Sequence, residues 1–234
     1  MPGVPAAVDV SDPTRRRSVD IIIQRLSGRP RDDSIDSSIL DAAARIIIDD
    51  GYSAATIAAI VKAAGTSKPA FYRRFDSVAD LVPALVERRH QLSVPADTGS
   101  LTGDLCAFQT AQAEIFNDPF VRAAMPGWLA HMQESPETSG PFVEGFLPQR
   151  MAVLEAILAR AEERGDAVRS GLDMDTLMEA CVGPFLMRSL IPGAPLLDDA
   201  DVDPTVALAC LLIDQASAAA SAPPASGVRS RPHD

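Results

Sequence analysis

A short segment of the chain brings together the kinds of side chain that bind nucleic acid. Phe71 and Phe75 lie four residues apart, so on a helix they predict one apolar inner face. The outer face then carries Lys68 and the run Tyr72–Arg74. Cationic side chains contact phosphates, and polar side chains of a short helix can reach base edges in the major groove. The segment therefore predicts a DNA-contacting helix.

The residues just before this helix supply the elements that would position it. Residues 56–64 predict a first helix, with Ile60 and Val61 on its apolar face. Gly65 can adopt the left-handed conformation that ends a helix at low cost, and Ser67 can cap the second helix. Two short helices joined by a tight turn, the second with a basic outer face, form a helix-turn-helix pattern.

Further helices are expected on both sides of this pattern. One spans residues 33–50, ends at Gly51 and would hold the second helix at a fixed angle. The next helix begins at a predicted cap formed by Ser77 and Asp80. Pro83 lies inside that helix, where it removes one backbone hydrogen bond and predicts a kink. The kink could act as a hinge, or it could be a bend that fits the core.

The ordered set of motifs across these helices resembles the DNA-binding signature of the TetR (tetracycline-repressor-like) family of bacterial regulators. The matching segments, within residues 35–85, are Ile39–Ala43, Gly51–Tyr52, Thr56–Ile60, Ala63–Gly65, Ser67–Lys68 and Phe71–Phe75. The resemblance implies an all-α fold, with an N-terminal three-helix helix-turn-helix DNA-binding domain and a C-terminal helical ligand-binding and dimerisation domain. The family often has Lys where this chain has Val78, so one phosphate contact would be absent.

The residues expected at a DNA interface lie in this signature and just ahead of it. Lys68, Tyr72 and Arg73 are the expected contacts, and Thr56 would bind a phosphate. Arg29 and Arg31 belong to a Pro-containing basic stretch that resembles the core of an AT-hook; it could enter a narrow minor groove or serve as a solubilising tail. The full predicted set is Arg29, Arg31, Thr56, Ser67, Lys68, Pro69, Ala70, Tyr72 and Arg73, with Ser67, Pro69 and Ala70 at the groove surface.

The charge of the chain is unevenly distributed. Residues 1–92 hold 13 Lys and Arg against 12 Asp and Glu, a net charge of +1. Residues 93–234 hold 8 against 20, a net charge of −12. DNA contact is therefore expected through a small basic patch on an otherwise acidic protein.

The sequence contains no pattern typical of catalysis or of a metal site. Phosphate-binding glycine loops and the GxSxG and HExxH motifs are absent, and the three histidines lack metal-ligand spacing. Cys106, Cys181 and Cys210 are far apart, which favours reduced core residues in a cytoplasmic protein. No run approaches the roughly 20 apolar residues that a membrane helix needs. We therefore expect no enzyme, no cofactor, no metal and no membrane partner.

Five helices are predicted after the loop that follows the DNA-binding signature. They span about residues 100–117, 119–134, 141–164, 173–190 and 203–218. Gly183–Pro184 would interrupt the fourth, and Asp203 would cap the fifth, with Pro204 as its first residue.

Aromatic and Met side chains concentrate in these helices and predict an apolar cavity. A helical bundle built from such residues can leave a cavity between its helices, and the resemblance implies that it binds a small-molecule effector. The predicted lining residues are Phe108, Phe120, Met125, Trp128, His131, Met132, Phe146 and Phe185. Trp128 and His131 lie three apart, so they could share a contact. The alternative is that these side chains simply fill the core.

The last two predicted helices carry apolar stripes that suit a dimer interface or the core of one subunit. The stripes contain Leu177, Ala180, Cys181 and Pro184 on one helix, and Val206, Cys210 and Ile213 on the other, beside Leu208, Leu211 and Leu212. The resemblance implies a homodimer on double-stranded DNA with a palindromic operator.

The resulting interpretation is a DNA-binding transcriptional regulator, a repressor released by a small apolar effector. The alternative is a small-molecule-binding or protein-interaction module on the same scaffold with weak DNA binding. The expected organisation is a flexible basic arm (1–28), the DNA-binding domain (29–78), the ligand-binding and dimerisation domain (79–218) and a disordered tail (219–234).

Overall fold

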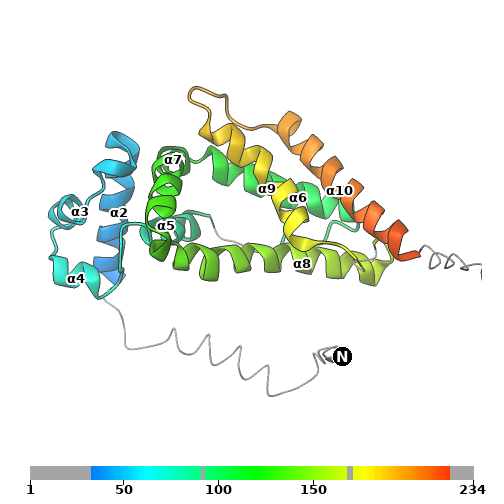
Figure 1. Ribbon diagram of the computed structural model, residues 1–234, viewed down its shortest axis with the longest axis horizontal. Coiled ribbons are helices and arrows are strands. Elements are labelled where there is room, and N and C mark those ends of the chain that lie inside the picture. Colours follow the sequence, from blue (N-terminus) through cyan, green and yellow to red (C-terminus); the bar gives the residue numbers. More distant parts are fainter. Residues whose placement is uncertain (1–32, 91–92, 168–170, 222–234) are drawn as a thin grey trace, which may run out of the picture.

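The chain folds into helices only, in the part that the structure describes. A computed structural model describes residues 33–90, 93–167 and 171–221, and every regular element within these ranges is helical. Three helices, α2 (Asp33–Asp50), α3 (Ile57–Ala63) and α4 (Lys68–Tyr72), form a head at one end of an elongated molecule (Figure 1). The all-α prediction is confirmed.

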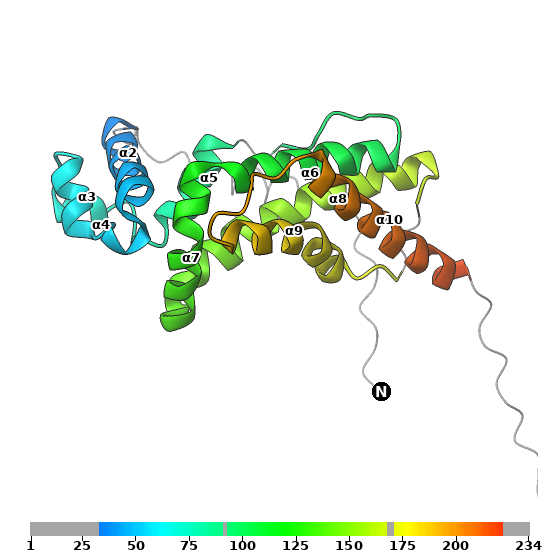
Figure 2. The same ribbon diagram turned by 90° about the horizontal axis from the view of Figure 1, so that it is seen from above.

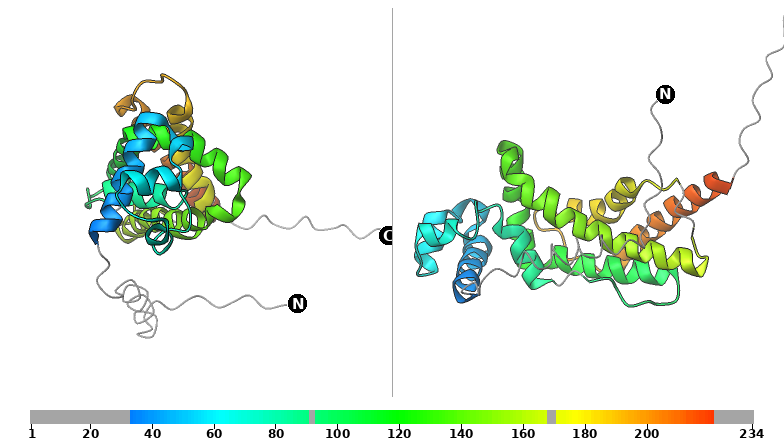
Figure 3. Two further views of the ribbon diagram at one scale, coloured as in Figure 1. Left: turned by 90° about the vertical axis from the view of Figure 1, so that its left-hand side faces the viewer. Right: turned by 90° about the horizontal axis from the view of Figure 1, so that it is seen from below.

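The rest of the described chain forms a body of long helices. Its helices are α6 (Leu101–Asn117), α8 (Leu147–Arg164), α9 (Met174–Leu190) and α10 (Asp199–Ser221). Two further helices, α5 (Leu81–Arg89) and α7 (Pro119–Glu134), lie where the head meets the body (Figure 2). Viewed from the head end, the helices of the head lie in front of those of the body (Figure 3).

Local hydrogen bonds end and begin the short helices of the head as the sequence predicts. Thr56 is the N-cap of α3 and its Oγ1 accepts the Ala59 N–H at 3.2 Å. Gly65 takes a φ of 65° in the turn, which a residue with a Cβ would adopt only with strain. Ser67 caps α4 and its Oγ accepts the Ala70 N–H at 3.4 Å. The helix-turn-helix geometry is therefore set by residues within the turn itself.

The helix that follows the head begins two residues before Pro83, so the proline lies in its first turn. The carboxylate of Asp80 accepts the Ser77 N–H at 3.0 Å and the Ser77 Oγ–H at 2.8 Å, so the predicted contact between these residues forms. The helix begins after it, at Leu81, which makes Pro83 only its third residue. The physical reason for the predicted kink is therefore absent, because N–H groups in the first helical turn have no intrahelical acceptor to lose.

Buried polar and apolar contacts hold the body together. The Gln109 amide of α6 donates to the Cys181 carbonyl of α9 at 2.9 Å and to Thr205 Oγ1 of α10 at 2.6 Å. Leu105 and Leu177 are fully buried in the same core. Gln109 therefore links three helices within an otherwise apolar interior.

A predicted interruption and a predicted helix start in the body are wrong. α9 continues through Pro184, and α10 starts at Asp199, so that Pro204 lies inside it. In each helix a proline removes one backbone hydrogen bond, but buried residues on both sides hold the helix in place. In α10 these include Val202, 2% exposed, and Thr205, 3% exposed. A further departure is a π-helical segment, η3 (Pro141–Phe146), which precedes α8 in the predicted 141–164 helix.

Helix α7 packs directly onto the head. Its Gly127 lies against Tyr52, which belongs to the short 3-10 helix η1 (Tyr52–Ala54), and a Cβ at Gly127 would stand 2.8 Å from Tyr52 Cβ. The Tyr52 ring also lies 6.0 Å from the His131 ring, one helical turn further along α7. The absence of a side chain at Gly127 thus permits the close approach between head and body.

Replacing Gly127 with Ala tests this close approach. In a helix the change alone would stabilise the protein by up to about 1 kcal/mol. We expect instead a loss of about 1–3 kcal/mol in the free energy of unfolding, because the methyl group pushes Tyr52 away. Urea unfolding followed by circular dichroism measures it. Gly145→Ala is the matched control, because nothing lies within 4 Å of its added Cβ. Equal stability changes in the two variants would contradict the packing.

Candidate functional site

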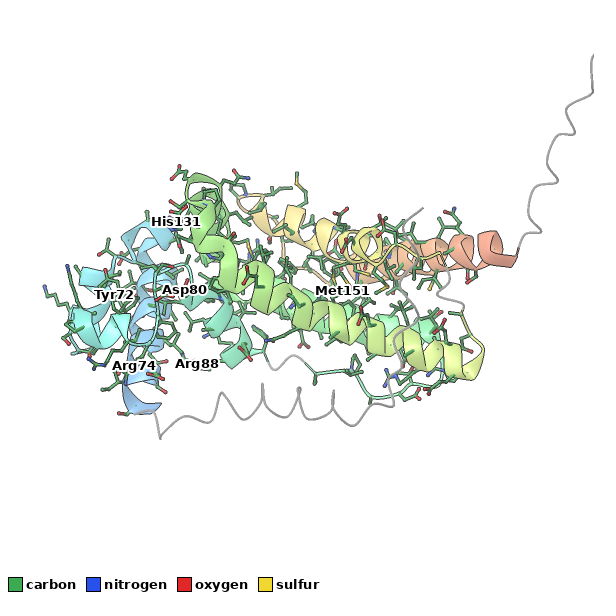
Figure 4. The ribbon with its side chains drawn as sticks, turned by 60° about the horizontal axis from the view of Figure 1, so that its bottom comes forward. Tyr72, Arg74, Asp80, Arg88, His131 and Met151 are labelled. Carbon is green, nitrogen blue, oxygen red and sulfur yellow. The ribbon has the colours of Figure 1, made fainter. Side chains whose placement is uncertain are left out.

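The outer face of α4 presents the side chains that the sequence singled out. Lys68 and Arg73 are exposed, and Tyr72 is 54% exposed at the tip of the head (Figure 4). The Tyr72 ring lies edge-on to the buried Phe71 ring at 5.8 Å, which orients it outward. Ser67, Pro69 and Thr56 are also exposed. Lys68, Tyr72 and Arg73 therefore lie on one accessible face, with two cations and a phenol able to bind phosphate or base edges.

Two of the expected outward residues point inward instead. Arg74 forms an ion pair with Asp36 of α2 and donates to the Ala70 carbonyl at 3.1 Å, so its guanidinium fixes α4 against α2. Ala70 is only 5% exposed, so the prediction that it lies at a groove surface is wrong: its methyl group packs into the head. Arg29 and Arg31 lie outside the described residues.

A second ion pair fixes the other side of the head. Arg88 of α5 donates to the Asp41 carboxylate of α2 at 2.7 Å, close to the surface. Surface pairs of this kind contribute at most about 1 kcal/mol each, so their role is mainly to orient the helices. Together with Arg74–Asp36, the pair holds α2 between α4 and α5.

An apolar cavity of about 730 Å³ lies between the helices of the body. Its walls come from α5, α6, α7, η3, α8 and α9, with Pro83 and Val86 of α5 among them. A cavity of this size can hold a small organic molecule. Of the predicted lining residues, Met125, Trp128 and Phe146 line it.

The other predicted lining residues lie elsewhere. Phe120 and Phe185 are almost completely buried and fill the core. Phe108 lines a smaller pocket of about 350 Å³. His131 faces Tyr52 of the head, and Met132 packs against the core beside the cavity without lining it. The expected shared contact of Trp128 and His131 is replaced by two separate contacts: His131 faces Tyr52 of the head, and Trp128 binds Ala79, between the head and α5.

Trp128 belongs both to the cavity wall and to the contact with the head. Its Nε1–H donates to the Ala79 carbonyl at 3.1 Å, just before α5. Its ring meets the Phe142 ring edge-on, with centroids 5.0 Å apart, and Phe142 also lines the cavity. Trp128 is 3% exposed, so this hydrogen bond is shielded from water. A change in the cavity that moves the indole therefore changes a contact with the segment that joins the head to α5.

The ends of α5 and α7 are tied together by a cluster of charged groups. Asp118, the N-cap of α7, accepts from Arg89 Nε at 2.8 Å and lies 2.9 Å from His90 Nε2. Burial acts to raise the pKa of Asp118, but the hydrogen bonds from Arg89, the Phe120 N–H and His90 outweigh it and leave that pKa below its ordinary value. The carboxylate is therefore ionised at neutral pH and joins α5 to α7.

Local sequence patterns did not predict Arg150, which is the one cation among the described residues that line the cavity. Arg150 of α8 is 4% exposed, and its guanidinium carbon lies 5.1 Å from the centroid of the Phe146 ring. Burial lowers the pKa of Arg150 to about 10, so it remains charged at neutral pH. Its position depends on packing between distant helices, which no local pattern records.

Among the described residues, no group of three or more His, Cys, Asp or Glu could hold a metal ion. Nor is any helix in those ranges both long and apolar enough to cross a membrane.

The chain matches two family models and several known proteins. Residues 39–85 match the model described as bacterial regulatory proteins, tetR family, and residues 95–209 match the tetracyclin repressor-like C-terminal domain. The chain is 28% identical over 183 residues to the uncharacterized HTH-type transcriptional regulator Rv1556 of Mycobacterium tuberculosis, covering 76% of this chain and 89% of that one. It is 28% identical over 179 residues to the DNA-binding transcriptional repressor TetR of Mycobacteroides abscessus, covering 73% and 88%.

A solved structure shares the fold. Salmonella enterica GusR superposes with a TM-score of 0.60 at 16% identity, over 77% of this chain and 95% of that chain. At this identity the likeness concerns the arrangement of helices and not the ligand.

The single tryptophan offers a direct test of the cavity. Trp128 is the only Trp in the chain and is 3% exposed, so we expect iodide in water to leave its fluorescence almost unchanged. Bromobenzene, which is apolar and carries a heavy atom, should enter the cavity and quench it with saturation. Val182→Phe, a change in the opposite wall, should weaken this quenching. Quenching by bromobenzene that rises linearly without saturation would show that the cavity does not bind apolar molecules.

Proposed function

Because the chain belongs to the tetracycline-repressor-like (TetR) family of DNA-binding transcriptional regulators, we propose that it is a repressor released from DNA by a small apolar effector. The observation that carries the proposal is the double role of Trp128, which lines the cavity and donates to the Ala79 carbonyl beside the head. The relative from Mycobacteroides abscessus bears the name of a repressor, which supports repression rather than activation.

DNA binding is assigned to the exposed face of α4. Lys68, Tyr72 and Arg73 would contact the major groove, with Ser67 and Pro69 at the same surface. Thr56 would donate its hydroxyl hydrogen to a phosphate, since its oxygen already accepts the Ala59 N–H. Val78 is half-buried and packs against the core, so it adds no phosphate contact. We keep Arg29 and Arg31 as proposed minor-groove contacts.

The proposed domain division follows the same reasoning. Residues 29–78 form the DNA-binding domain and residues 79–218 the ligand-binding and dimerisation domain. The separate family matches to residues 39–85 and 95–209 support two units, although the first match runs into α5. Residues 1–28 and 219–234 remain the proposed arm and tail.

Exposed apolar side chains on α9 and α10 support a homodimer. Leu177, Cys181, Val206 and Ile213 are buried within one subunit, so part of the predicted stripes belongs to its own core. Outside that core, Met187 is 62% exposed, Leu211 52% and Leu208 39%. Helices that pair across a twofold axis through these side chains would place two heads on one palindromic operator, with recognition helices about 34–36 Å apart.

The effector would act by favouring one position of the heads over another. Pro83 and Val86 place α5 in the cavity wall, and Trp128 joins that wall to the residue two positions before α5. A molecule that fits the cavity better when α5 and α7 have moved will shift the protein toward that arrangement. A molecule that binds both arrangements equally would leave DNA binding unchanged.

Removing cations from the face of α4 tests the DNA assignment. We expect Lys68→Ala and Arg73→Ala each to weaken binding to DNA from upstream of the protein's own gene by about tenfold or more, because one good contact contributes roughly 1–3 kcal/mol. Binding is measured by fluorescence anisotropy over a salt series. A lost phosphate contact should also reduce the salt slope by about 1.

Arg188→Ala is the matched control, because Arg188 lies in α9 and pairs with Asp201. It should change DNA affinity by less than about twofold, and sedimentation should show the same oligomer in all variants. Unchanged affinity for Lys68→Ala and Arg73→Ala would refute the assignment. Weak, sequence-indifferent binding by the unmodified protein would favour a small-molecule-binding or protein-interaction module on the same scaffold.

A further inference from the structure

We propose that the effector is an apolar molecule with one carboxylate, which binds Arg150 in the cavity wall. This inference rests on the proposed function, because it assigns the chemical class of the molecule that the cavity takes. The proposal depends on the surroundings of Arg150, whose buried positive charge borders the cavity.

Arg150 has a charge that no described residue neutralises. It is 4% exposed, and its Nη1 is buried without a hydrogen-bond partner. Its one described interaction is with the Phe146 ring, at 5.1 Å from the centroid. An aromatic face offsets only a small part of the cost of removing a cation from water. A buried guanidinium in this state is therefore poised to bind an anion.

Arg150 lines both the large cavity and the smaller pocket. Arg150 and Ile115 line the cavity of about 730 Å³ and also the smaller pocket of about 350 Å³. Arg150 thus borders both spaces. An anion bound there can keep its apolar part in the larger cavity.

A second unpaired donor lies in the smaller pocket. Gln112 is 2% exposed, lines that pocket, and its Nε2 is buried without a partner. A carboxylate has two oxygens, so it can accept from a guanidinium and from an amide at the same time. Two buried donors without acceptors in one place match a planar anion better than a hydroxyl or a neutral carbonyl group.

The remaining charges limit the ligand to a monoanion. Asp175 and Glu179 of α9 also line the large cavity, and Glu114 lines the small pocket, all three exposed. These carboxylates repel a dianion that entered past them. Arg89 and His90 line the small pocket as well, but both are already paired with Asp118. Arg150 alone supplies one positive charge to the large cavity. A monocarboxylate is neutralised by it, whereas a phosphate monoester would keep excess negative charge in an apolar site.

Paired probes that differ in charge alone test the proposal. Isothermal titration calorimetry on the full chain compares decanoate with 1-decanol and 4-phenylbenzoate with 4-phenylbenzamide, so that a chain-like and an aromatic body are both sampled. We expect at least one acid to bind about tenfold or more tightly than its neutral partner, as is typical of a hydrogen bond to a charged group. In Arg150→Met this preference should disappear, while the neutral partner binds within about threefold of its affinity for the unmodified protein.

Arg122→Met is the matched control. Arg122 also has a buried Nη1 without a partner, but its Nη2 donates to the Ala194 carbonyl at 2.8 Å and it lines neither pocket. This variant should keep the preference for the acid. Arg150→Met should unfold at the same temperature as the unmodified protein or higher, because it removes an unpaired buried charge.

Three results would overturn the proposal: equal binding of acid and neutral partner to the unmodified protein, an acid preference that survives in Arg150→Met, or no saturable binding of either acid. The effect of each probe on DNA affinity separates this inference from the proposed function. Acid-selective binding without any change in DNA affinity would support the carboxylate site and refute release by the effector. Release of DNA by 1-decanol as readily as by decanoate would support release by an apolar effector and refute the carboxylate site.

Discussion

The hydrogen bond from Trp128 to the Ala79 carbonyl is the contact on which the proposed communication between the cavity and the head depends. It joins α7 to the segment between the head and α5, and it is shielded from water on both sides. The same indole packs on Phe142 in the cavity wall. Because Gly127 also brings α7 against Tyr52, a shift of α7 cannot leave the head in place. The state of the cavity and the orientation of the head are therefore physically linked.

Ion pairs and a shared core hold the helices of the head in fixed positions relative to one another. Arg74 binds Asp36 and Arg88 binds Asp41, so these two cations fix α4 and α5 to α2. The exposed face of α4 then keeps its angle relative to α2 when α7 moves. Individual pairs of this kind are weak, but they act on helices that already share a buried apolar core. In the proposed dimer, affinity for two half-sites would depend on the separation of two such heads, so small movements would be effective.

Local features of the fold were predictable from the sequence, and features that depend on distant packing were not. The caps at Thr56 and Ser67 form within single turns, so residue type and spacing suffice to predict them. Pro204 was predicted to start a helix because proline favours that position, but burial of Val202 extends the helix upstream. Arg150 was missed altogether, because its burial results from helices that are far apart in sequence. The cavity was predicted in outline, while its charge and its link to the head were not.

The central claim is that the cavity and the DNA-binding face are coupled through Trp128, and it can be measured without knowing the effector. Met151 lies in the cavity wall on α8, away from the head (Figure 4), so Met151→Trp fills the cavity from within. The measurement is the factor by which this change weakens DNA binding, in the unmodified protein and in Trp128→Phe, which keeps a ring but loses the hydrogen bond. The account predicts that Met151→Trp weakens DNA binding by about tenfold in the unmodified protein and by less than about threefold in Trp128→Phe. Equal factors in the two backgrounds would contradict it.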